Sequence, residues 1–241
     1  MTTHVTTRNP VRADLPTSGT PTPSTRRTSN GWALAGVAAG VLGIGTMVSS
    51  STINAIYDKS IALDEDAILA KLADQSVQII TFQVVASLTA LALVVFAAGL
   101  HRRLAARLDD SIVPMVASAG LIGTAVVTVL GTGLDTEFAV GIEDHVLAAN
   151  AAMFNHWTGT IPWCWLLVGL SALAVASAWR QGAVPRWMGI ASLVLGGLTV
   201  VSGVLPVQYM AIVPGSLWVL VISVGFLVGD KQFRGAHRSS N

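Results

Sequence analysis

Charged side chains are scarce in this sequence. Only 11% of its 241 residues are Asp, Glu, Lys or Arg, whereas 52% are hydrophobic. Soluble domains carry about 25% charged residues, because charged side chains are mostly exposed to water. The shortage therefore excludes an ordinary soluble enzyme and a disordered chain, and it indicates an integral membrane protein.

Cysteine and lysine are also rare. The single cysteine, Cys164, excludes an intramolecular disulfide framework. Lysine occurs only at Lys59, Lys71 and Lys231, and arginine supplies the other basic residues. A net charge of +1 gives no long-range field that would attract nucleic acid. Together with abundant Ala, Gly and Val, the use of arginine in place of lysine is typical of bacteria with GC-rich genomes.

The first 30 residues show no hydrophobic periodicity. Sixteen of them are Thr, Ser or Pro, and such a segment cannot bury enough apolar surface to offset its ordering entropy. We expect residues 1–30 to form a disordered cytoplasmic tail, with docking or Ser/Thr phosphorylation as a further role. Residues 230–241 are predicted to form a basic cytoplasmic tail, which leaves residues 31–229 as the transmembrane domain.

Six stretches are long and apolar enough to cross a membrane as helices. A hydrocarbon core about 30 Å thick requires about 20 apolar residues. The cores of these stretches contain no Asp, Glu, Lys, Arg or His. The predicted fold is therefore an all-α, polytopic membrane bundle with spans at 32–51, 77–100, 114–134, 157–179, 188–206 and 209–229.

The charges outside the spans separate by sign. Twelve of the 14 basic residues lie in the two tails and in the segments 101–113 and 180–187. Nine of the 13 acidic residues lie on the other side, in segments that hold only two lysines. The positive-inside rule places the basic side, with both termini, in the cytoplasm. We therefore predict a multi-pass protein of the cytoplasmic membrane, whose main partner is the lipid bilayer.

A short amphipathic helix is predicted between the first two spans. The acidic run 64–66 precedes an apolar sequence, and acidic residues favour a helix start through the helix dipole. Ile68 and Leu72 are four residues apart, so one face of this helix is apolar. We expect it to lie on the outer membrane surface or to continue into the second span, as a lid or strut. A contact with a partner or ligand is the alternative.

Glycine and proline indicate how the spans pack. Gly36 and Gly40 in the first span, and Gly225 and Gly229 in the sixth, form GxxxG patterns that let two helices approach closely. We expect packing within the chain, with a homo-oligomer contact as the alternative. Pro162 removes a backbone donor near the outer end of the fourth span, where we expect a kink.

Three residues of the outer loop 135–156 are candidates for catalysis. Asp135 and Glu137 follow the third span, and His156 precedes the fourth. Because consecutive helices are usually neighbours, an acid–histidine dyad that acts as a base or proton relay is one hypothesis. A solvated acidic loop without catalytic function is the alternative.

The same loop contains candidate metal ligands. Glu143, Asp144 and His145 supply carboxylates and an imidazole, which bind divalent metals. Their spacing does not match a known ligand motif, so these residues are only weak candidates.

Polar residues inside two spans suggest a cavity open to the outer side. Gln83 and Ser87 share one helical face of the second span, and His156, Thr160 and Trp163 share one face of the fourth. Polar groups at this depth usually turn into a bundle to find hydrogen bonds. They are expected either to line a common cavity or simply to bond one helix to another.

One inner segment carries a family resemblance. The sequence Val184-Pro185-Arg186-Trp187, followed by a glycine-rich helix, resembles uncharacterised bacterial six-helix membrane proteins with a Val/Ile-Pro-Arg-Trp inner loop. The amphipathic segment 64–74 and the basic run 101–103 are similar as well, and the resemblance covers about residues 31–229. It implies a six-helix architecture and no catalytic residue.

Function is constrained mainly by missing motifs. The P-loop, Rossmann, GxSxG and HExxH patterns are absent, and we expect no cofactor. The leading hypothesis is a multi-pass membrane protein without catalytic machinery, of transport-related, envelope or regulatory type. The alternatives are a membrane-embedded enzyme that acts on a lipid or isoprenoid at the outer interface, and an outer-face sensor.

Overall fold

The computed structural model describes residues 30–142 and 146–228. These residues form helices and connecting turns, with no strand among them. Six helical segments are long and apolar enough to cross a membrane. The predicted all-α bundle with six spans is confirmed, and the protein is a multi-pass membrane protein. The predicted tails, apart from Asn30, and the candidate ligands Glu143, Asp144 and His145 lie outside the described residues.

Long helices make up the bundle, and short ones lie at one end of it. The spans comprise α1 (Gly31–Ser51), α3 (Ser76–Ala105), α4 (Val113–Gly131), α7 (Ala148–Thr158) with α8 (Leu166–Arg180), α9 (Arg186–Val204) and α10 (Ile212–Val228). The short elements are η1 (Ala55–Tyr57), α2 (Glu65–Ala73), α5 (Asp135–Val140), η2 (Ile161–Trp163) and η3 (Gln208–Ala211).

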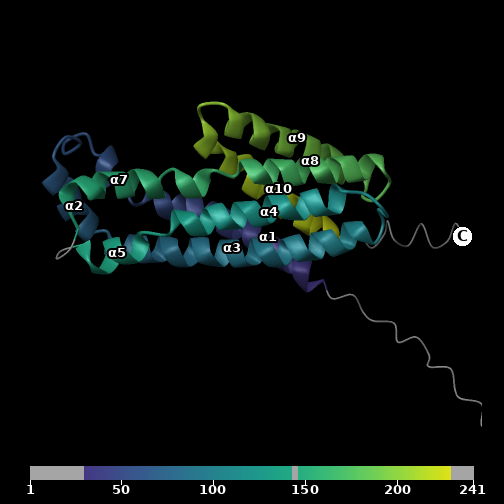
Figure 1. The fold of residues 1–241 in the computed structure, drawn as a ribbon, viewed down its shortest axis with the longest axis horizontal. Coiled ribbons are helices and arrows are strands. Elements are labelled where there is room, and N and C mark those ends of the chain that lie inside the picture. The colour runs from purple at the N-terminus through teal and green to yellow at the C-terminus, as the bar shows by residue number, and fades with distance from the viewer. Residues whose placement is uncertain (1–29, 143–145, 229–241) are drawn as a thin grey trace, which may run out of the picture.

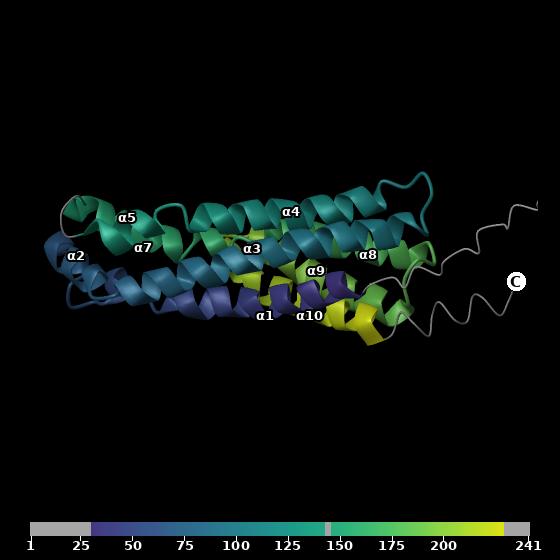
Figure 2. The ribbon, with the colours of Figure 1, turned by 90° about the horizontal axis from the view of Figure 1, so that it is seen from below.

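The helices pack largely in sequence order. Helix α1 lies between α3 and α10, α4 lies between α3 and α8, and α9 packs on the outside against α8 and α10 (Figures 1 and 2). Both described chain ends lie at the end of the bundle opposite α2, α5 and α7. The connections between α3 and α4 and between α8 and α9 also lie at that end, which we call the basic end because arginines lie in or directly beside these connections.

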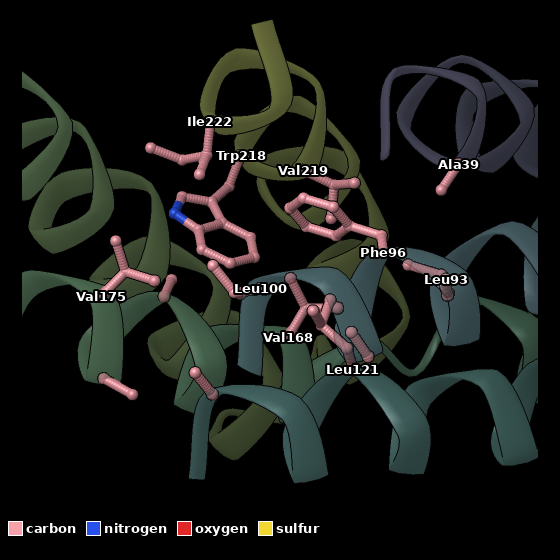
Figure 3. Close-up of a cluster of buried hydrophobic side chains, with 14 of the residues drawn as sticks. Ala39, Leu93, Phe96, Leu100, Leu121, Val168, Val175, Trp218, Val219 and Ile222 are labelled. Atoms are coloured by element: carbon pink, nitrogen blue, oxygen red, sulfur yellow. The ribbon is translucent and has the colours of Figure 1, made fainter. Parts of the chain in front are cut away.

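Large side chains fill the centre of the bundle. Figure 3 shows residues of α1, α3, α4, α8 and α10 converging around Trp218 and Phe96, both of which are fully buried. The indole Nε1 of Trp218 donates a hydrogen bond to Ser192 Oγ at 2.9 Å, so its polar atom is satisfied. The bundle core is therefore a packed interior.

Helix α3 connects this core to both ends of the molecule. At the basic end, Arg103 is buried, donates from Nη2 to the carbonyl oxygen of Ala183 at 3.5 Å, and stands over the ring of Phe226 at 5.9 Å. Such a cation–π contact contributes about 0.5–2 kcal/mol. Arg103 thus joins the end of α3 to the α8–α9 connection and to α10.

Small residues let α1 and α10 approach to backbone contact. A Cβ atom built on Gly40 would lie 2.7–2.8 Å from Cβ, Cα and N of Leu220, and one on Gly36 would overlap the Ser223 hydroxyl. Gly225 packs against the Trp187 ring in the same way. The expected packing within the chain is confirmed for these three glycines. Gly229 lies outside the described residues, and a homo-oligomer contact stays a prediction.

A second group of helices lies beyond the bundle. We call residues 52–75, α5 and α7 the cap. Helix α3 has 30 residues and is therefore about 45 Å long, which exceeds the ~30 Å hydrocarbon core. Its first turns share a separate hydrophobic cluster with the cap, formed by Ile53, Ala55, Ile68, Leu72, Ile79, Phe82, Ala86, Phe138, Ile142, Ala151 and Phe154.

The cap corrects two expectations. The segment 135–156 was expected to be an outer loop, but its described residues form α5 and the first part of α7. The amphipathic helix is confirmed as α2, and Asp64 caps it by accepting a hydrogen bond from Ala67 N. Its apolar residues Ile68 and Leu72 are buried in the cap cluster, however, and do not face lipid. This agrees with the role of a strut.

The fourth span is interrupted, where the sequence predicted a kinked but continuous helix. Helix α7 ends at Thr158, and α8 begins only at Leu166. Pro162 lies in η2 between them, its carbonyl accepts a hydrogen bond from Trp165 Nε1 at 3.0 Å, and its ring packs on Gly131. The fixed φ angle and missing N–H of proline oppose an unbroken helix here.

The close contact of α1 with α10 yields a prediction. The variant Gly40→Ala is expected to lower the free energy of unfolding by about 1–3 kcal/mol, because its methyl group meets helix backbone that cannot yield. Thermal unfolding in detergent, followed by circular dichroism, measures the loss.

Gly197→Ala is the matched control, since a Cβ atom at Gly197 meets nothing within 4 Å. Its stability should be unchanged or slightly raised, because alanine favours helix more than glycine does. Equal effects of the two variants would contradict the proposed packing.

Candidate functional site

A pocket of about 440 Å³ lies where the cap meets the bundle. Four separate parts of the chain form it: the end of α1, η1, the α7–η2 connection, and η3. We call it the junction pocket, and its lining residues are Ser50, Ser51, Tyr57, Gly159, Thr160, Trp163 and Tyr209.

Hydrogen bonds and ring contacts hold the aromatic walls of the junction pocket. The indole Nε1 of Trp163 donates to Ser50 Oγ at 2.6 Å, which fixes the ring of η2 against α1. The ring of Tyr57 meets His156 edge-on, with 6.3 Å between centroids. A Cβ atom on Gly159 would lie 2.6 Å from Tyr57 Oη, so glycine is needed to leave room for the phenol.

The chemistry of the junction pocket is neutral. Its lining combines three aromatic rings with hydroxyl groups and contains no charged side chain. Partial burial raises the pKa of the Tyr57 hydroxyl above its ordinary value, so this group stays un-ionised at physiological pH. Apolar walls with a few polar groups are typical of small-molecule sites, and this lining suits an uncharged molecule that has both apolar and hydroxyl-bearing parts.

A buried asparagine of α7 fixes the cap segment beside the pocket. Asn155 accepts a hydrogen bond from Ile56 N at 2.8 Å and donates from Nδ2 to the Ile53 carbonyl oxygen at 2.6 Å. Nearby, Asn54 and Gln75 form a reciprocal pair with distances of 3.2 and 3.0 Å. The backbone groups that these side chains bond, Ile53 O, Asn54 N and Ile56 N, lie just after the end of α1. The hydrogen bonds thereby set the position of the neighbouring Tyr57.

An ion pair borders the junction pocket on its cap side. Lys71 Nζ lies 2.8 Å from Asp58 Oδ2, with about a third of each side chain exposed. Hydrogen bonds from Lys71 and Ser60 hold the pKa of Asp58 well below its usual range. A smaller hollow of about 270 Å³ is lined by this pair together with Asn54 and Tyr57, so Tyr57 separates a neutral pocket from a charged one.

The three residues considered for the acid–histidine dyad lie in different environments. Asp135 is fully buried, and neither carboxylate oxygen has a hydrogen-bond partner in the part of the chain that the structure describes. Glu137, two residues later on α5, is exposed. His156 is exposed on α7, where its ring contacts Tyr57. No contact between Asp135 and His156 is found among the described residues.

The residues of the predicted cavity separate in a similar way. Thr160 and Trp163 line the junction pocket, and His156 adjoins it through Tyr57. Gln83 instead reaches Thr136 of α5 at 3.4 Å. Ser87 lies in an apolar groove of about 390 Å³ between α3 and α4. The five residues therefore do not line one cavity.

Metal binding has no support from the described part of the chain, where no group of three or more His, Cys, Asp or Glu side chains comes together. The candidates Glu143, Asp144 and His145 lie outside that part.

Three residues of the junction pocket region were missed by sequence reasoning. Tyr57, Tyr209 and Asn155 match no sequence motif. The two hydrogen bonds of the Asn155 side chain, for example, join residues 99 and 102 positions apart. A weak signal existed in Asn155, an amide within an otherwise apolar helical run next to His156. Its partners are backbone atoms, which no sequence pattern reveals.

Comparisons with protein-family models, with curated proteins and with solved structures found no match to this chain.

The asparagine clamp predicts a local loss of order. Asn155→Ala should destabilise the protein by about 2–4 kcal/mol, because the buried Ile53 carbonyl and the Ile56 N–H both lose their partner. Hydrogen exchange in residues 52–58 should rise before exchange in the bundle core.

Asn150→Ala serves as the control, because Asn150 is an exposed asparagine on the same helix. It should change neither stability nor exchange by a measurable amount. If both variants behave alike, the side chain of Asn155 does not hold the cap.

Proposed function

We propose that this multi-pass protein binds a small, uncharged amphiphile in the junction pocket, on the outer face of a bacterial cytoplasmic membrane, and that its role is regulatory or sensory and not catalytic. The observation that carries the proposal is the neutral aromatic and hydroxyl lining at the point where cap and bundle meet. A ligand there contacts α1, η1, η2 and η3 at once, so its binding bears on the position of the cap.

The orientation rests on charge. The basic end carries Arg107 in the α3–α4 connection and Arg102, Arg180 and Arg186 in the adjoining helix ends, and the cap lies at the other end. The positive-inside rule then puts the basic end in the cytoplasm and the cap outside. The junction pocket would therefore open at the outer interface, where an amphiphile can arrive from water or from the lipid leaflet.

Packing supports binding over passage of a solute. Trp165, Trp218 and Phe96 are fully buried and occupy the space between the helices. A water-filled path through the described bundle would need these rings to move.

The catalytic alternative has less support. Of its three candidates, Asp135 is buried, whereas Glu137 and His156 are exposed. Among the described residues, no hydrogen bond or ion pair joins an acid of this set to the histidine. The resemblance to six-helix proteins with a Val/Ile-Pro-Arg-Trp inner loop remains part of the proposal, and it too implies no catalytic residue.

The first test is ligand binding in lipid nanodiscs. Octyl glucoside, below its critical micelle concentration, is the uncharged probe, and saturation-transfer NMR measures its affinity. Tyr209→Ala removes one aromatic wall of the pocket and should weaken binding about threefold to tenfold, because an aromatic contact contributes about 0.5–1.5 kcal/mol. Octyl sulfate should bind less well, because the lining offers no cation.

Val207→Ala is the matched control, since Val207 lies in the same connection without lining the pocket. It should bind octyl glucoside as the wild-type protein does. Failure of the wild-type protein to bind, or equal losses in both variants, would rule out this pocket as the site.

The second test concerns orientation. Lys59 is exposed in the cap, so a membrane-impermeant amine reagent should label it on intact cells, as read by peptide mass spectrometry. Lys231 follows the last span and should be labelled only after lysis. The opposite order of labelling would reverse the proposed topology.

A further inference from the structure

A buried carboxyl group in the cap has no role in the junction pocket. Asp135 is 0% exposed, and neither of its oxygen atoms has a hydrogen-bond donor within residues 30–142 and 146–228. An ionisable side chain buried in a membrane protein is usually paired or functional. Arg103, the other buried charged residue in the described chain, has the polar and aromatic partners given above.

Among the described residues, no charged side chain near α5 compensates this carboxyl group. Helix α5 packs against α3 and α2. Between residues 76 and 100, α3 has no ionisable side chain, and the same holds for α4. On α2, Glu65 and Asp66 are exposed and Lys71 is paired with Asp58.

Helix α7 offers no charge to Asp135 either. The contact between α5 and α7 is a stack of the Phe138 and Phe154 rings, with centroids 3.9 Å apart. Thr158 at the end of α7 is buried, and its hydroxyl donates to the Asn155 carbonyl oxygen. The one ionisable residue of α7, His156, is exposed beside Tyr57.

We propose that Asp135 is a proton-binding site that holds the cap closed. A buried carboxylate without donors costs far more free energy than a neutral carboxylic acid in the same place. The closed arrangement therefore contains the protonated form. When Asp135 releases its proton to water, the carboxylate regains hydration only if α5 moves away from α3.

The attachment of α5 is weak enough to permit this movement. The helix has six residues, too few to be stable alone. Its contacts with the other elements include the Phe138–Phe154 ring stack, the buried Ile142 just beyond its end, the packing of Leu134 and Ala139, and the 3.4 Å contact between Thr136 and Gln83. Because the closed cap binds the proton more tightly than the open cap, raising the pH must favour opening. This inference concerns a proton, and it stands whether or not the junction pocket binds an amphiphile.

Hydrogen exchange of the full-length protein in nanodiscs tests the proposal. Protection factors of the 132–142 amides, each referred to the intrinsic exchange rate at the same pH, are compared at about pH 5 and about pH 8. In the wild-type protein they should fall about tenfold or more, since one pKa unit of differential proton binding corresponds to a factor of ten. Amides at the centre of α3 should keep their protection at both values.

Two variants separate Asp135 from the rest of α5. Asp135→Asn keeps the shape but cannot ionise, and its protection should change less than about twofold between the two pH values. Glu137→Gln removes the exposed acid of the same helix and should behave as the wild-type protein does. A flat wild-type profile, a fall retained in Asp135→Asn, or a fall abolished by Glu137→Gln would each overturn the proposal.

A spectroscopic readout covers the case in which Asp135→Asn does not fold. Infrared spectra of the wild-type protein at about pH 6 should contain the C=O band of a protonated carboxylic acid, and that band should disappear at about pH 9. The Glu137→Gln protein should show the same band. Its absence from the wild-type spectrum at pH 6 would also overturn the assignment.

Discussion

The length of α3 is the constraint on which the cap depends. At 30 residues, α3 is about 15 Å longer than a ~30 Å hydrocarbon core, and its basic last turn accounts for part of that excess. Its first turns carry Ile79 and Phe82, whose burial requires other elements at this end of the helix. Helices α2, α5 and α7 supply them, and the junction pocket exists because this second hydrophobic cluster has to meet the bundle.

Polar groups at this junction are used unevenly. Asn155, Asn54 and Gln75 satisfy backbone and side-chain partners with short hydrogen bonds, whereas Asp135 is left without any. Fully satisfied amides stabilise one arrangement. A buried acid without partners stabilises an arrangement only while it is neutral. The cap is therefore held through α7 by satisfied amides, whereas its attachment through α5 depends on the protonation of Asp135.

Sequence reasoning found the spans but not the cap. Hydropathy and charge predicted six helices and the amphipathic segment, because these properties follow from local composition. At Pro162 the sequence predicted only a kink. The interruption also depends on the packing of Gly131 and Trp165 on the proline, which local sequence does not reveal. The acidic residues of 135–156 suggested a solvated loop. Its apolar residues Phe138, Ala151 and Phe154 are instead buried in the cap cluster. Tyr57, Tyr209 and Ser50 meet only through the tertiary fold.

The interruption between α7 and α8 has a mechanical consequence. The residues between α7 and α8 are not α-helical. Rotation of the cap would therefore be transmitted poorly to α8. Helix α3 is the uninterrupted rod between the two ends in the described structure, with Phe82 in the cap and Arg103 against Ala183 and Phe226. Any piston-like or twisting motion that starts in the cap would reach the basic end through that arginine.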